Sequence, residues 1–98
     1  MIDRIVTNKS PAAFGTYSQA TVFRKLIFTS EQIPLSPETG EIVCDDITSQ
    51  TEQVMKNIAG LLEAVGSGYS NVLKTTCFIT DMVHFPVFNE VYASYFAN

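Results

Sequence analysis

One apolar face repeats between residues 47 and 65, and it constrains the fold more than any other feature of the sequence. Asp45 or Asp46 can cap the start of a helix there, and Gly66 can adopt the left-handed backbone that ends one. Spacings of three, four and seven residues predict a helix that packs one side on a sheet. The residues of this face are Ile47, Val54, Ile58, Leu61, Leu62 and Val65.

Three short stretches before this helix have the composition of β-strands. Residues 2–6 fit a short edge strand, and residues 18–23 and 26–33 fit a hairpin that turns at Arg24 and Lys25. Neither turn residue is Gly or Asn, so the sequence leaves the turn type open. Prolines and a Glu-Thr-Gly turn within residues 34–42 end the hairpin ladder.

Two further elements are expected after the helix. Residues 73–80 carry weakly polar side chains on both faces, which predicts a central strand with Cys77 as a small core residue. A second helix begins near His84 and continues to the end of the chain. The order of elements predicts an α+β two-layer sandwich, with an antiparallel or mixed sheet and two helices on one face. The second helix should bury Phe85, Phe88, Val91 or Tyr92, Tyr95 and Phe96.

The composition indicates one folded domain that assembles with other subunits. The chain has 98 residues, of which 46% are hydrophobic and 16% charged, so we treat residues 1–98 as a single domain. A chain this short buries roughly 60–65% of its unfolded surface. Seven Phe and four Tyr are many for this length, and we expect part of their surface to face another subunit.

The charge balance argues against nucleic acid as a partner. The net charge is −4, and only Arg24 and Lys25 form an adjacent basic pair, whereas phosphate binding needs clustered bases. No apolar run has the length of a membrane span or the form of a secretory signal, so we expect a cytoplasmic protein without membrane contact. Cys44 and Cys77 lie far apart with no further ligand at metal-binding spacing.

Familiar catalytic motifs are missing from the sequence. There is no nucleophile elbow, Walker loop or dinucleotide fingerprint, and the glycines at Gly66 and Gly68 follow a helix, where a helix cap is the expected use. His84 is the only histidine, which excludes a site with several histidine ligands. Composition and spacing therefore lead only to an oligomeric α+β domain.

Four segments carry a resemblance that goes further: SPAAFGTYSQA, IFTSEQIPLSPETGEI, KTTCFITDM and FNEVYASYF. In this order and spacing they resemble the Rid family, also called the YjgF family, of small imine deaminases. The resemblance implies a chorismate-mutase-like fold, a homotrimer, and ligand clefts between neighbouring subunits. It also implies hydrolysis of 2-imino or enamine acids to 2-keto acids and ammonia, without a metal or organic cofactor.

The resemblance also assigns candidate substrate-binding residues. Tyr17 matches the tyrosine of the family motif G-P-Y-S-Q-A, with Thr16 in place of the proline. Ser30 matches the serine of S-G-Q-I-P, and Asn89 matches the asparagine of N-E-V-Y. Hydroxyl and amide groups of these types can orient a small acid by hydrogen bonds. From the residues alone, a packed ring, a strand end and a solvent-facing amide are the favoured interpretations.

Two departures from the family pattern affect the expected site. Glu31 stands where the family has glycine, and a carboxylate beside the cleft should weaken binding of an acid. The family's arginine and late glutamate correspond to positions beyond Asn98, so the domain is expected to be incomplete at its C-terminus and its catalytic residues are not assigned. A non-catalytic trimeric module that binds a small ligand or a protein is the alternative. Translation inhibition through RNA is a weaker alternative, because the chain is acidic.

Overall fold

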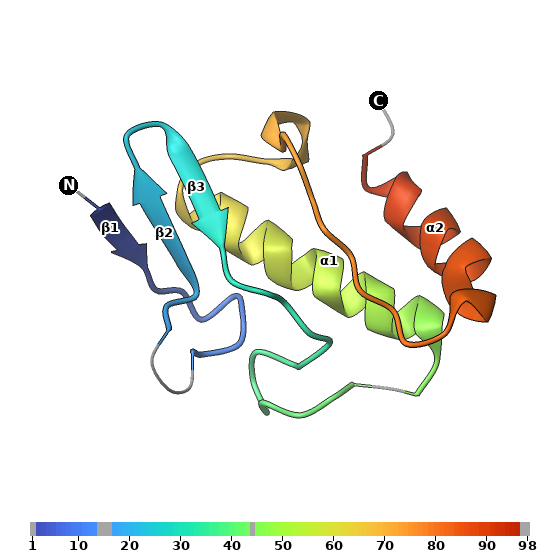
Figure 1. The fold of residues 1–98 in the computed structure, drawn as a ribbon. Coiled ribbons are helices and arrows are strands. Elements are labelled where there is room, and N and C mark those ends of the chain that lie inside the picture. Colours follow the sequence, from blue (N-terminus) through green and yellow to red (C-terminus); the bar gives the residue numbers. More distant parts are fainter. Residues whose placement is uncertain (1, 14–16, 44, 97–98) are drawn as a thin grey trace.

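The computed structural model describes residues 2–13, 17–43 and 45–96, so Thr16 and Cys44 lie outside the described part. The strands are β1 (Ile2–Ile5), β2 (Ala20–Phe23) and β3 (Leu26–Thr29), and the helices are α1 (Ile47–Ala64) and α2 (Phe85–Ser94). Two short 3-10 helices, η1 (Tyr69–Asn71) and η2 (Met82–His84), lie between α1 and α2 (Figure 1). This combination of an antiparallel sheet and two helices confirms the predicted α+β class.

The sheet has the order β1-β2-β3, and both pairings are antiparallel. Phe23 lies opposite Leu26, which confirms a two-residue turn at Arg24 and Lys25. Arg24 has a φ of 57°, and a positive φ at the first turn residue alone is the feature of a type II′ turn. Both hairpin strands are shorter than predicted: β2 begins at Ala20 rather than at residue 18, and β3 ends at Thr29 rather than at residue 33.

Both ends of α1 follow the prediction. At its start the Ser49 backbone N–H donates to the Asp46 carboxylate at 2.8 Å. At its end Gly66 has a φ of 73°, its N–H donates to the Glu63 carbonyl, and the Ser67 N–H donates to the Leu62 carbonyl. This pair of bonds is the Schellman motif, which satisfies carbonyl groups that a helix end leaves free.

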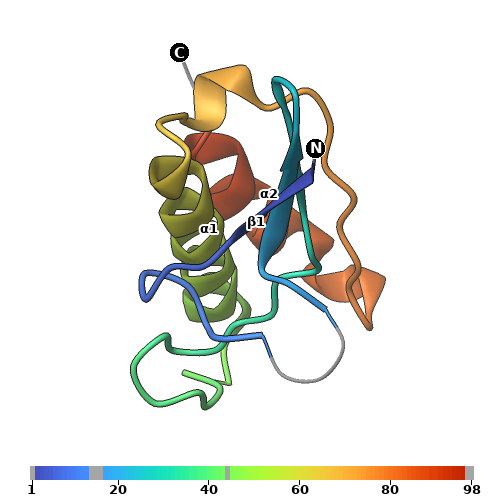
Figure 2. The ribbon, with the colours of Figure 1, turned by 90° about the vertical axis from the view of Figure 1, so that its left-hand side faces the viewer.

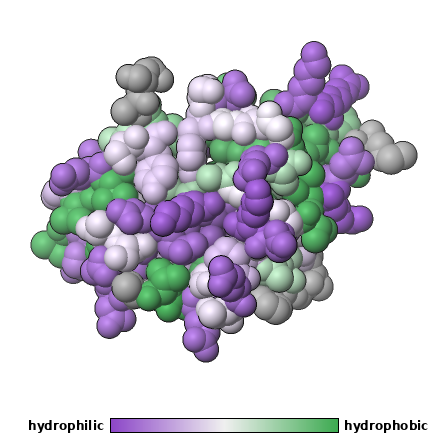
Figure 3. Space-filling model, turned by 180° about the vertical axis from the view of Figure 1, so that it is seen from behind, coloured by the Kyte–Doolittle hydropathy of each residue, from purple (hydrophilic) through white to green (hydrophobic). Residues whose placement is uncertain are grey.

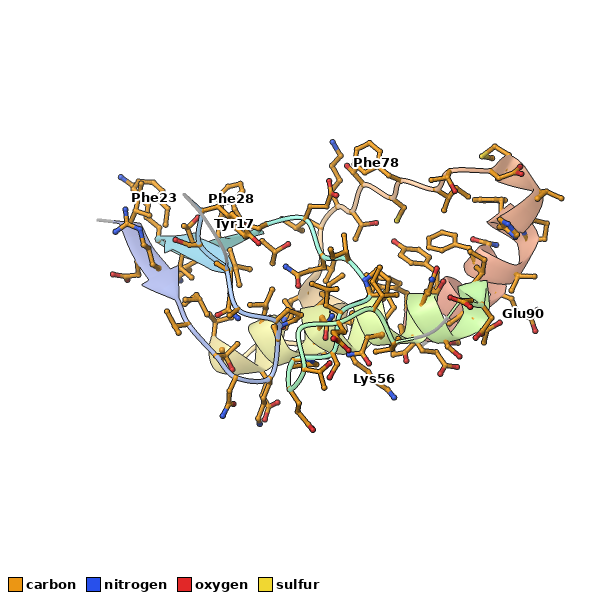
Figure 4. All side chains as sticks on the ribbon, turned by 90° about the horizontal axis from the view of Figure 1, so that it is seen from below. Tyr17, Phe23, Phe28, Lys56, Phe78 and Glu90 are labelled. Carbon is orange, nitrogen blue, oxygen red and sulfur yellow. The ribbon has the colours of Figure 1, made fainter. Side chains whose placement is uncertain are left out.

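The sheet and α2 use different parts of α1. The strands lie over the C-terminal half of the helix, and α2 packs against its N-terminal half (Figures 1 and 4). In the side view of Figure 2, the sheet and residues 73–80 lie on the same side of α1. No helix within the described ranges is long and apolar enough to cross a membrane.

The core is small, and polar residues hold it to the preceding loops. Met55, Leu61 and Leu62 of α1 are buried, as is Ala20 of β2. Asn57 is completely buried beside them, and it has a hydrogen-bond partner for each polar atom of its side chain. The helix face therefore includes a polar centre that the apolar periodicity did not reveal.

The Asn57 amide joins α1 to the segment that follows the hairpin. Its Nδ2 donates to the carbonyls of Ile33 at 3.2 Å and Leu35 at 3.0 Å, and its Oδ1 accepts from Gln53 at 2.8 Å. The backbone carbonyl of Asn57 accepts a hydrogen bond from the buried Ser10 hydroxyl. One helix position thus fixes two separate loops.

Gly60 lies one helical turn further along α1 and lets the chain at Lys9 touch the helix backbone. A Cβ atom at Gly60 would lie 2.5 Å from the Lys9 carbonyl oxygen and 2.8 Å from its carbon. The ion pair of Lys9 Nζ with Glu63, at 2.6 Å, is exposed on both sides and contributes little to stability. Close backbone packing, rather than the ion pair, positions this loop.

The predicted strand over residues 73–80 is wrong. The segment is extended but belongs to no sheet, and within the described residues its backbone has no hydrogen-bonded neighbour strand. Leu73 and Phe78 are 87% and 78% exposed. Cys77 is also exposed rather than a core residue. A sequence can favour extended backbone, but a strand forms only where another strand supplies partners.

The start of α2 at Phe85 confirms the second helix, but its aromatic face is only partly covered. Ring contacts run along it from Phe85 to Phe88, Tyr92 and Phe96, with centroids 6.3, 5.3 and 4.9 Å apart. Phe85 remains 42% exposed, and no residue of the helix is fully buried. The prediction that this face is buried is therefore wrong for the single chain.

Tyr69 of η1 connects α1 to the end of α2. Its ring makes edge-on contacts with Tyr95 at 5.6 Å and Phe96 at 5.4 Å, and its hydroxyl donates to the Met55 carbonyl. Burial, together with the electrostatic effect of Tyr95, raises the pKa of Tyr69 to about 12. The half-buried phenol is thus held in its neutral form.

We expect Gly60→Ala to lower the free energy of unfolding by about 1–3 kcal/mol, because the added methyl group meets the backbone of Lys9. Gly68→Ala is the matched control, since no heavy atom lies within 4 Å of its added Cβ. Urea titration of both variants measures the difference. Equal stability of the two variants would show that the loop at Lys9 does not pack on the helix.

We expect Tyr69→Phe to lose about 1 kcal/mol of stability at about pH 8, where the hydroxyl still donates to Met55. An unfolded tyrosine ionises near pH 10, below the folded pKa of about 12. The contribution of Tyr69 is therefore complete below pH 10 and is lost as the pH rises towards 12. Urea titrations should show that the difference in unfolding free energy between the parent and Tyr69→Phe narrows over this pH range.

Tyr17→Phe provides the control for this measurement, because the Tyr17 side chain is 54% exposed and its hydroxyl has no hydrogen bond among the described residues. It should leave stability unchanged at both ends of the pH range. A gap between the parent and Tyr69→Phe that stays constant with pH would contradict the raised pKa.

Candidate functional site

Gln19 organises the backbone around the candidate site. Its side chain is buried; Oε1 accepts from the Thr7 N–H at 2.8 Å, and Nε2 lies within 3.1 Å of the carbonyls of Thr7, Ser10 and Pro11. An amide suits this position because it both accepts and donates. Gln19 therefore fixes residues 7–11 against the start of β2, next to Tyr17 and Ser18.

Ser30 lies beside the same segment. Its backbone N–H donates to the Gln19 carbonyl at 3.0 Å, and its hydroxyl donates to the Ser18 carbonyl. A serine hydroxyl has one proton, so Oγ of Ser30 can only accept a further hydrogen bond. The predicted residues Tyr17 and Ser30 are thus brought to neighbouring positions by the register of the hairpin.

A cavity of about 270 Å³ opens at this end of the sheet. Arg4 and Thr7 line one part of it, and Ala13, Tyr17 and Ser18 line another. Tyr17 lies on the side of the sheet away from α1, in the same layer as Phe23 and Phe28 (Figure 4). The cavity therefore includes one residue that the family resemblance assigned, Tyr17.

The other two predicted site residues, Glu31 and Asn89, lie in different parts of the fold. Glu31 follows Ser30 directly and is exposed, so its carboxylate is close to this region along the chain. Asn89 is an exposed residue of α2, and α2 packs on the opposite half of α1 from Tyr17 (Figure 4). One chain therefore brings together Tyr17, Ser30 and Glu31 but not Asn89.

A second cavity of about 420 Å³ lies between the two helices. Its lining includes Glu52 of α1, Glu90 of α2 and Tyr95, which directly follows α2. This space contains none of the predicted site residues. The described residues offer no group of three His, Cys, Asp or Glu side chains that could hold a metal ion.

The outer face of the sheet is rich in exposed apolar side chains. The register places Ile2, Phe23, Leu26 and Phe28 on this face, and they are 64%, 41%, 48% and 60% exposed. Phe78 points in the same direction (Figure 4). On the far side from Figure 1, hydrophilic side chains cross the middle of the surface between hydrophobic areas (Figure 3).

Sequence reasoning missed Arg4 and Gln19. Arg4 belonged to a predicted edge strand, where an exposed cation is ordinary, and only the fold shows that it shares a cavity with Tyr17. Gln19 stands two residues after Tyr17 in a polar segment, and no periodic signal marks it as buried. Its position within the matched motif was the one available signal.

Comparisons with known proteins agree with this architecture. Residues 7–98 match the family model described as endoribonuclease L-PSP. The chain is 47% identical over 92 residues to reactive intermediate deaminase A, chloroplastic, of Arabidopsis thaliana, covering 94% of this chain and 49% of that protein. It is 39% identical over 92 residues to 2-iminobutanoate/2-iminopropanoate deaminase of Rattus norvegicus, covering 94% and 67%.

A solved structure extends the agreement to three dimensions. The Rid family protein YyfA from Yersinia pestis, described as a protein of unknown function, superposes with a TM-score of 0.97 at 41% identity. The comparison covers 100% of this chain and 78% of that one. The chain thus spans about half of the Arabidopsis protein and two thirds to four fifths of the other two. The shared sequence, the matched family model and the superposed fold together show that the chain belongs to the Rid/YjgF family.

Proposed function

We propose that this chain forms part of an imine deaminase that hydrolyses 2-imino acids to 2-keto acids and ammonia. The observation that supports this most is the place of Tyr17 in a cavity next to Ser30, in a chain 39% identical to a 2-iminobutanoate/2-iminopropanoate deaminase. Cytoplasmic location and the absence of an organic cofactor are parts of the same proposal.

The reaction needs orientation more than strong acid or base groups. Water adds to C2 of the imine as the C=N electron pair moves to nitrogen, and one proton of the water passes to that nitrogen. The second proton then passes from the new hydroxyl to nitrogen as the C2–N bond breaks, the C=O bond forms and ammonia leaves. The free Tyr17 hydroxyl can donate to an oxygen of the substrate. Ser30 Oγ, whose hydroxyl already donates a hydrogen bond to the Ser18 carbonyl, can accept one from the imine N–H. The two groups would thus hold opposite ends of the reacting centre.

We also propose that the site is completed by assembly into a homotrimer. The apolar outer face defined by Ile2, Phe23, Leu26 and Phe28 is the kind of surface that subunit contacts cover. Asn89 lies on the other half of its own chain, so it could join Tyr17 only if a neighbouring copy supplies it. The two-layer sandwich, with both helices on one face of the sheet, is part of the same proposal.

The alternative is a trimeric module that binds a small molecule without catalysis. The exposed Glu31 carboxylate favours it, because a negative charge beside the cavity disfavours an acidic substrate. Nucleic acid binding has the least support, since the chain carries a net charge of −4.

A coupled assay that detects keto acid from freshly generated 2-iminobutanoate tests the proposal. We expect hydrolysis above the rate in buffer, and Tyr17→Phe should reduce it at least tenfold. The control, Tyr92→Phe, alters a hydroxyl on α2 that lies next to Thr75 rather than in the cavity. Sedimentation of the same sample distinguishes the deaminase from the non-catalytic trimeric module. A trimer without activity would support the module and contradict the deaminase.

We expect Glu31→Gln to bind 2-ketobutyrate about three- to tenfold more tightly, because two carboxylates about 4 Å apart repel by roughly 1 kcal/mol even at the dielectric of water. Glu41→Gln is the matched control, since Glu41 is an exposed carboxylate in another loop. Calorimetric titration gives the affinities, and added salt should reduce the gain. Unchanged affinity of Glu31→Gln would place this carboxylate away from the ligand.

A further inference from the structure

We propose that the groove between α1 and α2 docks an arginine-bearing segment of a partner protein. This helix groove is the cavity of about 420 Å³ whose walls include Glu52 of α1 and Val87, Glu90 and Val91 of α2. Glu90 and Tyr17 lie towards opposite ends of the molecule (Figure 4). The inference is therefore independent of the proposed deaminase site.

The helix groove carries negative charge that the described part of the chain does not neutralise. Glu52 and Glu90 are exposed, and neither has an ion-pair or hydrogen-bond partner among the described residues. Lys56 follows Glu52 by four residues on α1 but is not within ion-pair distance of it. No Lys, Arg or His within residues 2–13, 17–43 and 45–96 lines the groove. A cationic group of another molecule would complement these two carboxylates.

The ends of the two helices also favour a cation. The groove reaches the C-terminal end of α2, where Ser94 is the last helical residue and Tyr95 is the C-cap. Carbonyl groups at this end give a helix a partial negative charge. Thr48 lies in the first turn of α1, but the Asp46 carboxylate already occupies the positive end of that helix and accepts from the Ser49 N–H at 2.8 Å.

The walls of the groove favour a cation on an apolar stem. Val87 and Val91 lie one helical turn apart on α2, and Tyr95 adds an aromatic residue. An arginine side chain can place its methylene groups on the valines while its guanidinium group contacts carboxylates and an aromatic ring. A metal ion would leave this apolar surface uncovered, and the described residues offer no group of three metal ligands.

A protein segment suits these surroundings better than a free amine. Glu52, Glu90 and Val87 all lie at the surface, so a free cation would stay hydrated on its outer side and gain little. The groove volume lies within the roughly 300–1,000 Å³ typical of sites for larger ligands. Apolar surface also continues along the chain, because Met82 and Val83 of η2 are 69% and 71% exposed. A segment that presents an arginine to the groove can cover these side chains as well.

The test is a titration of the ¹⁵N-labelled protein with the synthetic peptide acetyl-AVRVA-amide, followed by backbone amide chemical shifts. We expect a dissociation constant in the millimolar range or tighter, with the largest shifts at Glu52, Glu90 and Val91. The same peptide with citrulline in place of arginine keeps the shape but lacks the charge. It should bind at least tenfold more weakly, because its contacts with the carboxylates are not charge-assisted.

Variants of the groove locate the binding site. The double variant Glu52→Gln and Glu90→Gln should bind the arginine peptide at least tenfold more weakly than the parent. Glu41→Gln is the matched control, since Glu41 is an exposed carboxylate in another loop, and it should bind within twofold of the parent. Added salt should weaken binding to the parent. The amide spectrum of each variant verifies that it is folded.

Free N-acetylarginine amide distinguishes a small-molecule site from a docking surface. It should bind at least fivefold more weakly than the peptide, and equal affinity would contradict the docking of a protein segment. Absence of shifts at millimolar peptide, shifts confined to residues outside the groove, or equal binding of the citrulline peptide would overturn the proposal. The titration does not depend on imine hydrolysis, so the docking surface and the deaminase can each fail without the other.

Discussion

The buried Asn57 side chain on α1 is the interaction on which the rest of the structure depends. Its amide nitrogen donates to the carbonyls of Ile33 and Leu35, and the backbone carbonyl of the same residue accepts a hydrogen bond from the Ser10 hydroxyl. A buried amide is costly unless its polar atoms are satisfied, so this position stabilises only one arrangement of the two loops. Gly60 completes that arrangement because it lets the chain at Lys9 touch the helix.

The candidate site is built outward from this contact. The loop held on α1 continues into the residues that Gln19 binds, and Gln19 places Tyr17 and Ser18 beside Ser30. The wall containing Tyr17 and Ser30 is therefore supported by buried amide groups within one chain. By contrast, residues 73–80 and the aromatic face of α2 lack such support and leave apolar side chains exposed. The described part of the chain thus combines a candidate site held by buried hydrogen bonds with exposed apolar surfaces.

Local signals in the sequence predicted the parts of the fold that local chemistry determines. The Asp46 cap, the Gly66 end of α1 and the turn at Arg24 and Lys25 each follow from a few neighbouring residues. The strand predicted over residues 73–80 failed because pairing depends on a distant partner strand rather than on local preference. The motif around Tyr17 predicted a candidate site, but Arg4 could be associated with the cavity at Tyr17 only through the pairing of β1 with β2.

Amide hydrogen exchange measured residue by residue tests most directly whether the single chain preorganises one wall of the site. The account predicts slow exchange at the Thr7 and Ser30 amides, which donate to Gln19, at rates comparable with the interior of α1. The amides of Thr76 and Phe78, in the extended segment, should exchange at least a hundredfold faster. Equal rates at all four amides would contradict it, because the wall around Tyr17 and Ser30 would then be no more ordered than the segment without strand partners.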